Sequence, residues 1–186
     1  MAILSDNDEF SSGTWTAKTS MTTARAGAGS GMGLEIDGKG YVFCGLTTTS
    51  TDDVEEYVVD SWTSKTGTGQ NGVKLMYAGH IGTKGYIAAG FDTASAYIRT
   101  TREYDPTADS WTTKSNKPTP GSTDGWCHTI ASTDSRLYAM AGDKGGAGDA
   151  NIKDNDEYEA TGNSWTSKAD VTLGSVGSSA GRRWAG

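Results

Sequence analysis

Residues 56–65 read EYVVDSWTSK, and this phrase decides the fold because the chain repeats it four times. Each copy has an acidic-aromatic pair followed six to eight positions later by Trp-Thr-x-Lys. The copies span residues 9–18, 56–65, 103–114 and 157–168, and successive tryptophans lie 47, 49 and 54 positions apart. A period near 50 residues without helical periodicity indicates a repeat architecture built from short strands.

A second phrase alternates with the first and supplies two more strands to each unit. It reads KGYVFCG at 39–45, KGYIAAG at 84–90 and RLYAMAG at 136–142, each time directly after a turn signal. A segment rich in small residues precedes each turn, at 28–36, 73–81 and 125–133. One unit is therefore predicted to contain four strands, which is the content of one propeller blade.

The two phrases resemble the kelch repeat over nearly the whole chain. The likeness rests on the Tyr-Asp-Pro to Trp segment at 104–111 and on the Leu-Tyr-x-x-x-Gly segment at 137–142. The double glycine usual in that pattern is here a single one, Gly45, Gly90 or Gly142, after Cys or Ala. The resemblance implies a β-propeller fold and says little about function.

The ends of the chain predict how such a ring closes. Residues 1–4 precede the first Glu-Phe strand as a truncated second strand would, and the small residues of 174–186 follow the last Trp strand as a new innermost strand would. We therefore expect one all-β domain over 1–186, a four-bladed kelch-like propeller whose C-terminal strand completes the N-terminal blade. Its units are approximately 1–18 plus 174–186, 19–66, 67–115 and 116–173. The alternative is an eight-bladed ring of two chains, and we favour the monomeric ring because it avoids the cost of association.

Composition excludes several classes of partner. The net charge of −7 and the scattered Lys and Arg argue against nucleic acid. There is no apolar run near 18 residues and no secretory signal, so we expect neither membrane insertion nor export by that route. Cys44 and Cys127 fall at non-equivalent places in the repeat, and we interpret them as buried small residues, although the sequence leaves their pairing open.

The residues that could perform chemistry do not form a recognisable site. His80 and His128 lack the spacing of a zinc site, and the acidic runs at 6–9, 52–53 and 154–157 lack the spacing of a calcium loop. No nucleophile elbow or phosphate loop is present, so we expect no catalytic residue, metal or cofactor. We interpret the repeated aromatic residues as packing between blades; they are Trp15, Trp62, Trp111, Trp165, Tyr41, Tyr86 and Tyr138.

Binding is expected at loops on one face of the propeller. These loops join the fourth strand to the next first strand and the second strand to the third. The candidate contact residues are Arg25, Gln70, Asn71, Tyr97, Arg99 and Trp126.

The Thr/Ser/Gly-rich kelch-like phrases also look like those of structural proteins of tailed phages. This likeness implies a non-catalytic virion protein, as a capsid decoration or host-attachment module. Its partners would be other virion proteins or a host protein or glycan. The alternatives are a cellular protein- or glycan-binding propeller, which would be cytoplasmic, and a small carbohydrate-active enzyme.

Overall fold

The computed structural model describes residues 5–25, 32–47, 49–70, 77–91, 97–118, 129–143 and 151–172. Over these residues the protein is all-β, with three four-stranded antiparallel sheets and one two-stranded hairpin. The strands are β1 (Asn7–Ser11), β2 (Thr14–Lys18), β3 (Met32–Ile36), β4 (Lys39–Leu46), β5 (Ser50–Val58), β6 (Ser61–Lys65), β7 (Tyr77–Ile81), β8 (Lys84–Phe91), β9 (Tyr97–Asp105), β10 (Ser110–Lys114), β11 (Thr129–Ser132), β12 (Arg136–Asp143), β13 (Asn151–Glu159) and β14 (Ser164–Ser167). No helix long and apolar enough to cross a membrane occurs in this described part.

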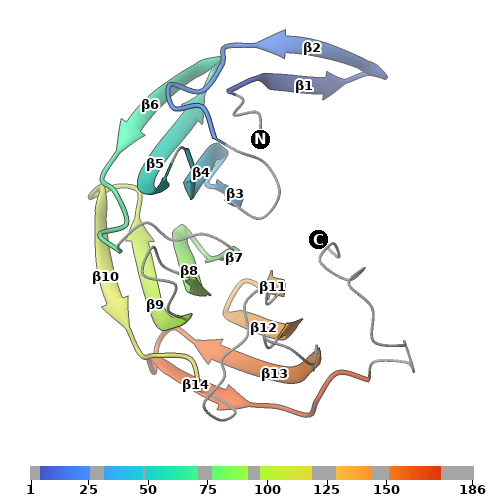
Figure 1. The fold of residues 1–186 in the computed structure, drawn as a ribbon, viewed down its shortest axis with the longest axis vertical. Coiled ribbons are helices and arrows are strands. Elements are labelled where there is room, and N and C mark those ends of the chain that lie inside the picture. The colour runs from blue at the N-terminus through green and yellow to red at the C-terminus, as the bar shows by residue number, and fades with distance from the viewer. Residues whose placement is uncertain are drawn as a thin grey trace.

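The sheets follow one another along an arc in a propeller-like arrangement (Figure 1). Each four-stranded sheet has its strands in chain order, from β3 to β6, from β7 to β10 and from β11 to β14. On the inner side of the arc the first strand β7 contacts both β3 and β11, and β6, β10 and β14 lie on the outer side. The predicted four-strand unit is therefore confirmed for three repeats.

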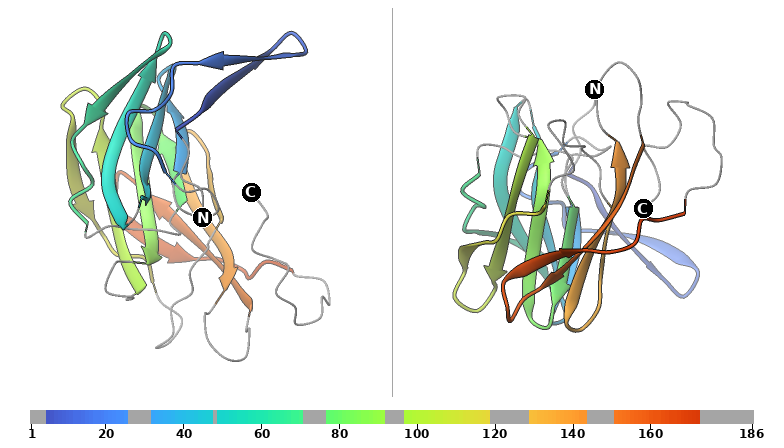
Figure 2. Two further views of the ribbon diagram at one scale, coloured as in Figure 1. Left: turned by 45° about the horizontal axis from the view of Figure 1, so that its top comes forward. Right: turned by 90° about the horizontal axis from the view of Figure 1, so that it is seen from below.

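The first repeat contributes only the hairpin β1–β2 to the described structure. This hairpin and β14 lie at opposite ends of the row of sheets (Figure 1 and the left view of Figure 2), and no contact joins them. Residues 1–4 and 174–186, on which the predicted ring closure depends, lie outside the described residues. Closure of the ring therefore stays a prediction.

The hydrophobic core lies between neighbouring sheets. One cluster joins Ile36, Tyr41 and Phe43 of the first full sheet to Ile87 and Tyr104 of the second. A second cluster joins Tyr86 of the second sheet to Leu137 and Tyr158 of the third. Since Tyr86 and Ile87 are adjacent on β8, the alternation of side chains along one strand supplies both interfaces of the middle sheet.

Tight turns close the hairpins on one face of the arc. The pairs Ser12–Gly13, Asp37–Gly38 and Val59–Asp60 all have positive φ at both residues, as in hairpin turns that match strand twist. Val59 is an unfavourable residue for this backbone because its side chain is β-branched, and it is 92% exposed.

A bulge follows the aromatic segment of the second strand in each of the first two full sheets. The register shifts between Phe43 and Gly45 on β4 and between Ala88 and Gly90 on β8. Cys44 and Ala89 adopt φ of 54° and 59° there, directly before glycines that also have positive φ. In the kelch pattern that the sequence resembles, the first of two glycines stands at these positions. Here Cys44 and Ala89 therefore adopt a backbone conformation that favours glycine.

This geometry predicts different responses to glycine substitution at two adjacent buried alanines. Ala88→Gly and Ala89→Gly remove the same methyl group, but only the second removes it from a left-handed residue. We expect the Ala89→Gly variant to be more stable than the Ala88→Gly variant, with a free energy of unfolding about 1–2 kcal/mol higher. The reason is that a left-handed conformation costs an L-residue about that much, and glycine at position 89 does not have this cost. Urea denaturation of both variants measures the difference, and equal losses would contradict the strained bulge.

Candidate functional site

The Trp-Thr-x-Lys phrase joins each sheet to the one before it through main-chain atoms. Trp62 Nε1 donates to the Thr19 carbonyl at 2.8 Å, while the Thr19 N–H donates to Asp60 at 2.7 Å. One residue, the first after β2, is therefore held at both its N–H and its C=O. We call this arrangement the clamp.

The clamp recurs at the next two boundaries with the same geometry. Asp109 and Trp111 hold Thr66, at 3.0 Å for its N–H and 2.9 Å for its C=O. Asn163 and Trp165 hold Ser115, at 2.8 Å and 3.0 Å. The gripped residue in each case directly follows the Lys that ends the phrase, so the clamp sets the spacing from one sheet to the next.

A tyrosine from the third strand orients the acceptor of each clamp. The hydroxyls of Tyr57, Tyr104 and Tyr158 donate to Asp60, Asp109 and Asn163 at 3.2, 2.7 and 3.0 Å. Burial, together with the bond to Asp109, raises the pKa of Tyr104 far above its ordinary value. Burial likewise raises the pKa of Tyr158 to about 12.

The Glu and Lys of the phrase pair within each sheet. Lys18–Glu9, Lys65–Glu56, Lys114–Glu103 and Lys168–Glu157 have N–O distances of 3.0, 3.1, 3.1 and 2.9 Å. Tyr41 and Tyr86 of the second strands donate to Glu56 and Glu103. The Glu and Lys of all four phrases therefore have partners inside the fold.

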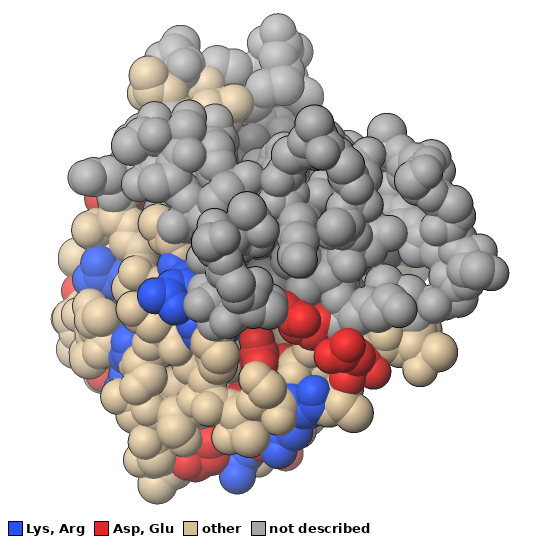
Figure 3. All heavy atoms as spheres, turned by 60° about the horizontal axis from the view of Figure 1, so that its bottom comes forward, with Lys and Arg blue, Asp and Glu red and all other residues tan. Residues whose placement is uncertain are grey.

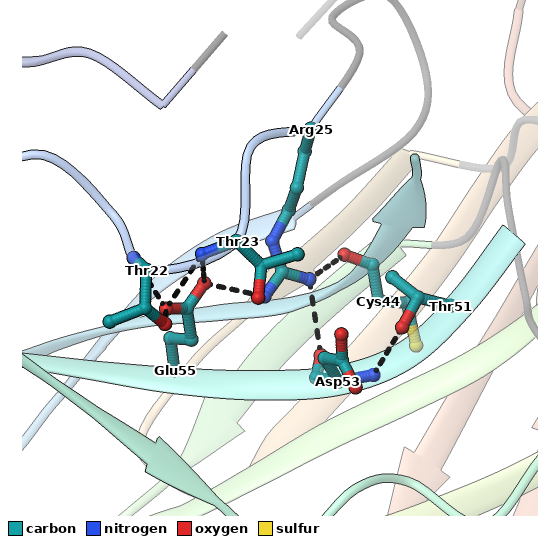
Figure 4. A network of polar contacts seen from close by, with 7 residues as sticks. All are labelled: Thr22, Thr23, Arg25, Cys44, Thr51, Asp53 and Glu55. Atoms are coloured by element: carbon teal, nitrogen blue, oxygen red, sulfur yellow. Dashed lines mark hydrogen bonds and ion pairs between the residues drawn. The ribbon is translucent and has the colours of Figure 1, made fainter. Parts of the chain in front are cut away.

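Buried ion pairs anchor two of the loops that enter a sheet. Arg25 binds Glu55 of β5 at 2.7 Å, and the Arg25 and Glu55 side chains are 3% and 1% exposed. Arg25 also donates to the carbonyls of Cys44 and Asp53, and Glu55 accepts from the Thr22 N–H at 2.8 Å (Figure 4). Burial opposes ionisation of Glu55, but the bonds from Arg25 and Thr22 hold its pKa below the ordinary value.

The positions equivalent to Glu55 differ in charge. Each precedes the acidic-aromatic pair of its repeat, and they are Arg102 in the second full sheet and Asp156 in the third. Asp156 pairs with Lys117 of the incoming loop at 2.5 Å, with both side chains 4% exposed. Arg102 instead lies near the Gln70 loop, where its buried Nε and both amide atoms of Gln70 lack a hydrogen-bond partner.

The described parts of the connections from fourth to first strands lie beside the third strands. Backbone bonds from Met21 to Ser5, from Thr68 to Asp52 and from Lys117 to Arg99 tie each fourth-to-first loop to the start of a third strand. On the face drawn in Figure 3, the acidic and basic side chains of the described residues are interspersed, so no field of a single sign covers its described part.

The six candidate contact residues have different fates in the structure. Arg25 is bound inside the fold, whereas Arg99 on β9 is exposed. Gln70 is partly buried, and Tyr97 begins β9. Asn71 and Trp126 lie outside the described residues.

The described part of the chain holds no group of three or more His, Cys, Asp and Glu residues that could bind a metal ion. His80 Nδ1 lies 3.2 Å from the Gly82 carbonyl, and Asp52 accepts from the Gly69 N–H at 3.2 Å. The buried Cys44 Sγ lies 3.6 Å from the Thr68 hydroxyl. His128 and Cys127 lie outside the described residues.

Sequence reasoning missed the acceptor of the clamp. The signal is the Asp-Ser-Trp triplet at 60–62 and 109–111, which becomes Asn-Ser-Trp at 163–165. Nothing in the sequence marks Arg25 as the partner of Glu55, because the partner of the equivalent Asp156 stands at a different place in its loop.

Comparison with known proteins supports the fold and gives no information about a chemical activity. No family model and no curated protein matches the chain, whereas 142 chains of solved structures do. One of them is a structure of YjhT, with a TM-score of 0.74 and 13% sequence identity over 92% of this chain and 67% of that one. At such low identity the likeness concerns the arrangement of the strands alone.

The clamp formed by Asp109 predicts that stability depends on pH, and that replacing the Asp109 carboxylate with an amide reduces this dependence. Burial opposes ionisation of Asp109, but hydrogen bonds from Tyr104 and Thr66 hold its pKa below the ordinary 3.8. Because the folded pKa is below the unfolded one, unfolding takes up a proton, and the stabilisation by Asp109 is lost as the pH falls through and below 3.8. We expect the difference in unfolding free energy between wild type and Asp109→Asn to be smaller at pH 3 than at pH 7.

Asn163 makes the reciprocal substitution available as a control. Asn163→Asp should add acid sensitivity to a clamp whose acceptor carries no carboxylate, so the stability of this variant should fall more steeply than that of wild type below pH 4. Urea denaturation across this pH range measures both slopes. Parallel slopes for all three proteins would contradict the role of the clamp carboxylate.

The buried Arg25–Glu55 pair predicts a large cost when one partner is removed. Arg25→Ala leaves the Glu55 carboxylate buried without its cation, and we expect a loss of about 3–5 kcal/mol in unfolding free energy. Lys18→Ala removes a partner from the solvent-exposed Glu9 pair and should cost much less. Denaturation of both variants tests the contrast, which similar losses would refute.

Proposed function

We propose that the chain is a non-catalytic structural and binding module of a phage particle, as a capsid decoration or host-attachment protein. It would bind a virion protein, or a host protein or glycan, through loops on one face of a kelch-like propeller. In this proposal the four repeats are the blades of a ring. The first blade is completed by the C-terminal strand, either of the same chain or of a second copy.

The difference between the two faces of the arc carries this proposal. On one face the strands are joined by short turns such as 12–13, 37–38, 59–60 and 82–83. On the other face the connections span 19–31, 66–76 and 115–128, and they differ in length and sequence from repeat to repeat. Variable loops on a regular scaffold are the usual location of binding residues.

The use of the repeated polar residues supports a scaffold rather than an enzyme. The Glu, Lys, Tyr, Asp and Trp of the phrase bind one another or the main chain of a neighbouring sheet. A catalytic role would require titratable groups that converge on a substrate. Among the described residues, the most deeply buried charged groups form two ion pairs instead, Arg25–Glu55 and Lys117–Asp156.

Binding by the loop face can be tested with substitutions on opposite faces. Arg99→Ala changes an exposed residue of the loop face, and Val59→Ala changes an exposed residue of the turn face. On a glycan array and on host cells, we expect the first variant to bind at least about tenfold more weakly, as for one charged hydrogen bond, and the second to bind like wild type. Equal binding by both would place the ligand elsewhere.

The virion assignment has its own test. Mass spectrometry and immunogold electron microscopy of purified phage particles should detect the chain on the capsid or the tail. Its absence from such particles would contradict the assignment. Release of a soluble product from a bound glycan would overturn the non-catalytic part of the proposal.

A further inference from the structure

The first repeat leaves an aromatic pair uncovered. Phe10 and Trp15 are 58% and 68% exposed, and they are the only exposed large aromatic residues in the described part of the chain. Their ring centroids lie 5.1 Å apart, against 5.0, 4.9 and 5.1 Å for the equivalent Tyr–Trp pairs of the other repeats. The hairpin therefore presents the pair in the geometry that the other repeats use for contact.

The other repeats show what such a pair contacts. Trp62, Trp111 and Trp165 each bind the carbonyl of the residue that follows the outer strand of the preceding repeat. For Trp15, by contrast, no described residue supplies a carbonyl to the indole. Within the described residues, the clamp of the first repeat therefore has no main-chain partner.

The opposite end of the arc presents a main-chain group of the kind that the other clamps hold. Ala169 follows Lys168 as Thr19 follows Lys18, Thr66 follows Lys65 and Ser115 follows Lys114. Ala169 is exposed, and no described residue bonds to its N–H or C=O. It is the main-chain group that a fourth clamp would grip.

The aromatic packing between sheets points to the same pairing. Tyr41 packs on Tyr104 of the next sheet with ring centroids 5.8 Å apart, and Tyr86 packs on Tyr158 at 5.7 Å. The next step in this series joins Tyr138 of β12, which is half-buried, to Phe10. The two ends of the arc therefore match in main-chain groups and in aromatic rings.

The two matching ends do not meet within one chain. The hairpin β1–β2 and the sheet β11–β14 lie at opposite ends of the arc and share no contact (Figure 1). We propose that the Phe10–Trp15 hairpin binds the open side of the β11–β14 sheet of a second copy of this chain, with Trp15 donating to the Ala169 carbonyl of that copy. The interface joins unlike surfaces, so two copies make two such contacts when they close a ring.

Gly13 leaves the clamp of the first repeat without a side-chain acceptor. It stands where the other repeats have Asp60, Asp109 and Asn163, and all four residues have positive φ, of 82°, 59°, 47° and 47°. The first clamp therefore lacks the side chain that would accept from the N–H of the gripped residue. Contact between copies depends on the two aromatic rings and one indole hydrogen bond.

Sedimentation of the full chain tests the proposal. Wild type should form dimers, or longer head-to-tail series, that dissociate on dilution, and Trp15→Ala should raise the dissociation constant at least about 30-fold, as for an interface anchor. The melting temperature of the monomer should change little, since Trp15 is 68% exposed and loses only its contact with Phe10. Val59→Ala, on an exposed turn of another repeat, is the matched control and should associate like wild type.

A second variant should strengthen the association between copies. Gly13→Asn supplies the missing acceptor in a backbone conformation that Asn tolerates and that Asn163 already adopts. We expect it to tighten association about 3- to 10-fold, the contribution of one hydrogen bond. Weaker association of this variant would contradict the proposed register.

Mixing two defective variants distinguishes unlike surfaces from any other dimer. Trp15→Ala damages only the hairpin, and Tyr138→Ala damages only the open sheet; Tyr138→Leu, which keeps an apolar side chain but removes the aromatic ring, replaces the latter if it does not fold. Each alone should sediment as a monomer, while their mixture should form heterodimers through one intact contact. A wild-type chain that is monomeric at all concentrations, or a dimer indifferent to Trp15→Ala, would overturn the proposal.

Discussion

The arrangement of the sheets depends on a two-point grip on the main chain. At each of three boundaries an indole and a turn side chain hold the C=O and N–H of the residue that leaves the preceding sheet. Two bonds to one peptide segment fix its orientation as well as its distance. The apolar clusters between the three full sheets can then form, because each sheet arrives at a constant offset from its neighbour.

Much of this could be predicted from the repeated phrase. The period of the tryptophans gave the repeat, and the turn signals gave four strands in chain order, which the three full sheets confirm. The prediction succeeded because strand order depends on local signals, namely turn residues and alternating side chains. The predicted closing strand rests on residues outside the described part, so the ring itself is still a hypothesis.

The site was less predictable for a physical reason. Arg25 was a candidate for ligand contact because it stands in a polar loop, yet it is bound beneath that loop to Glu55. The equivalent position carries Glu55, Arg102 and Asp156 in successive repeats, so the pairing follows no rule that a repeat alignment could reveal. Likewise, Cys44 and Ala89 have positive φ, a conformation that can be predicted from sequence only where glycine is present.

Because the grip closes on peptide atoms, the residue being held is free to change. Thr19, Thr66 and Ser115 share the role, and any residue other than proline offers the same two groups. The grip therefore constrains the gripping side chains more strongly than the residues that they hold. A chain of this design can keep its three-dimensional form while its sequence changes widely, in keeping with a solved structure that has a similar fold at 13% sequence identity.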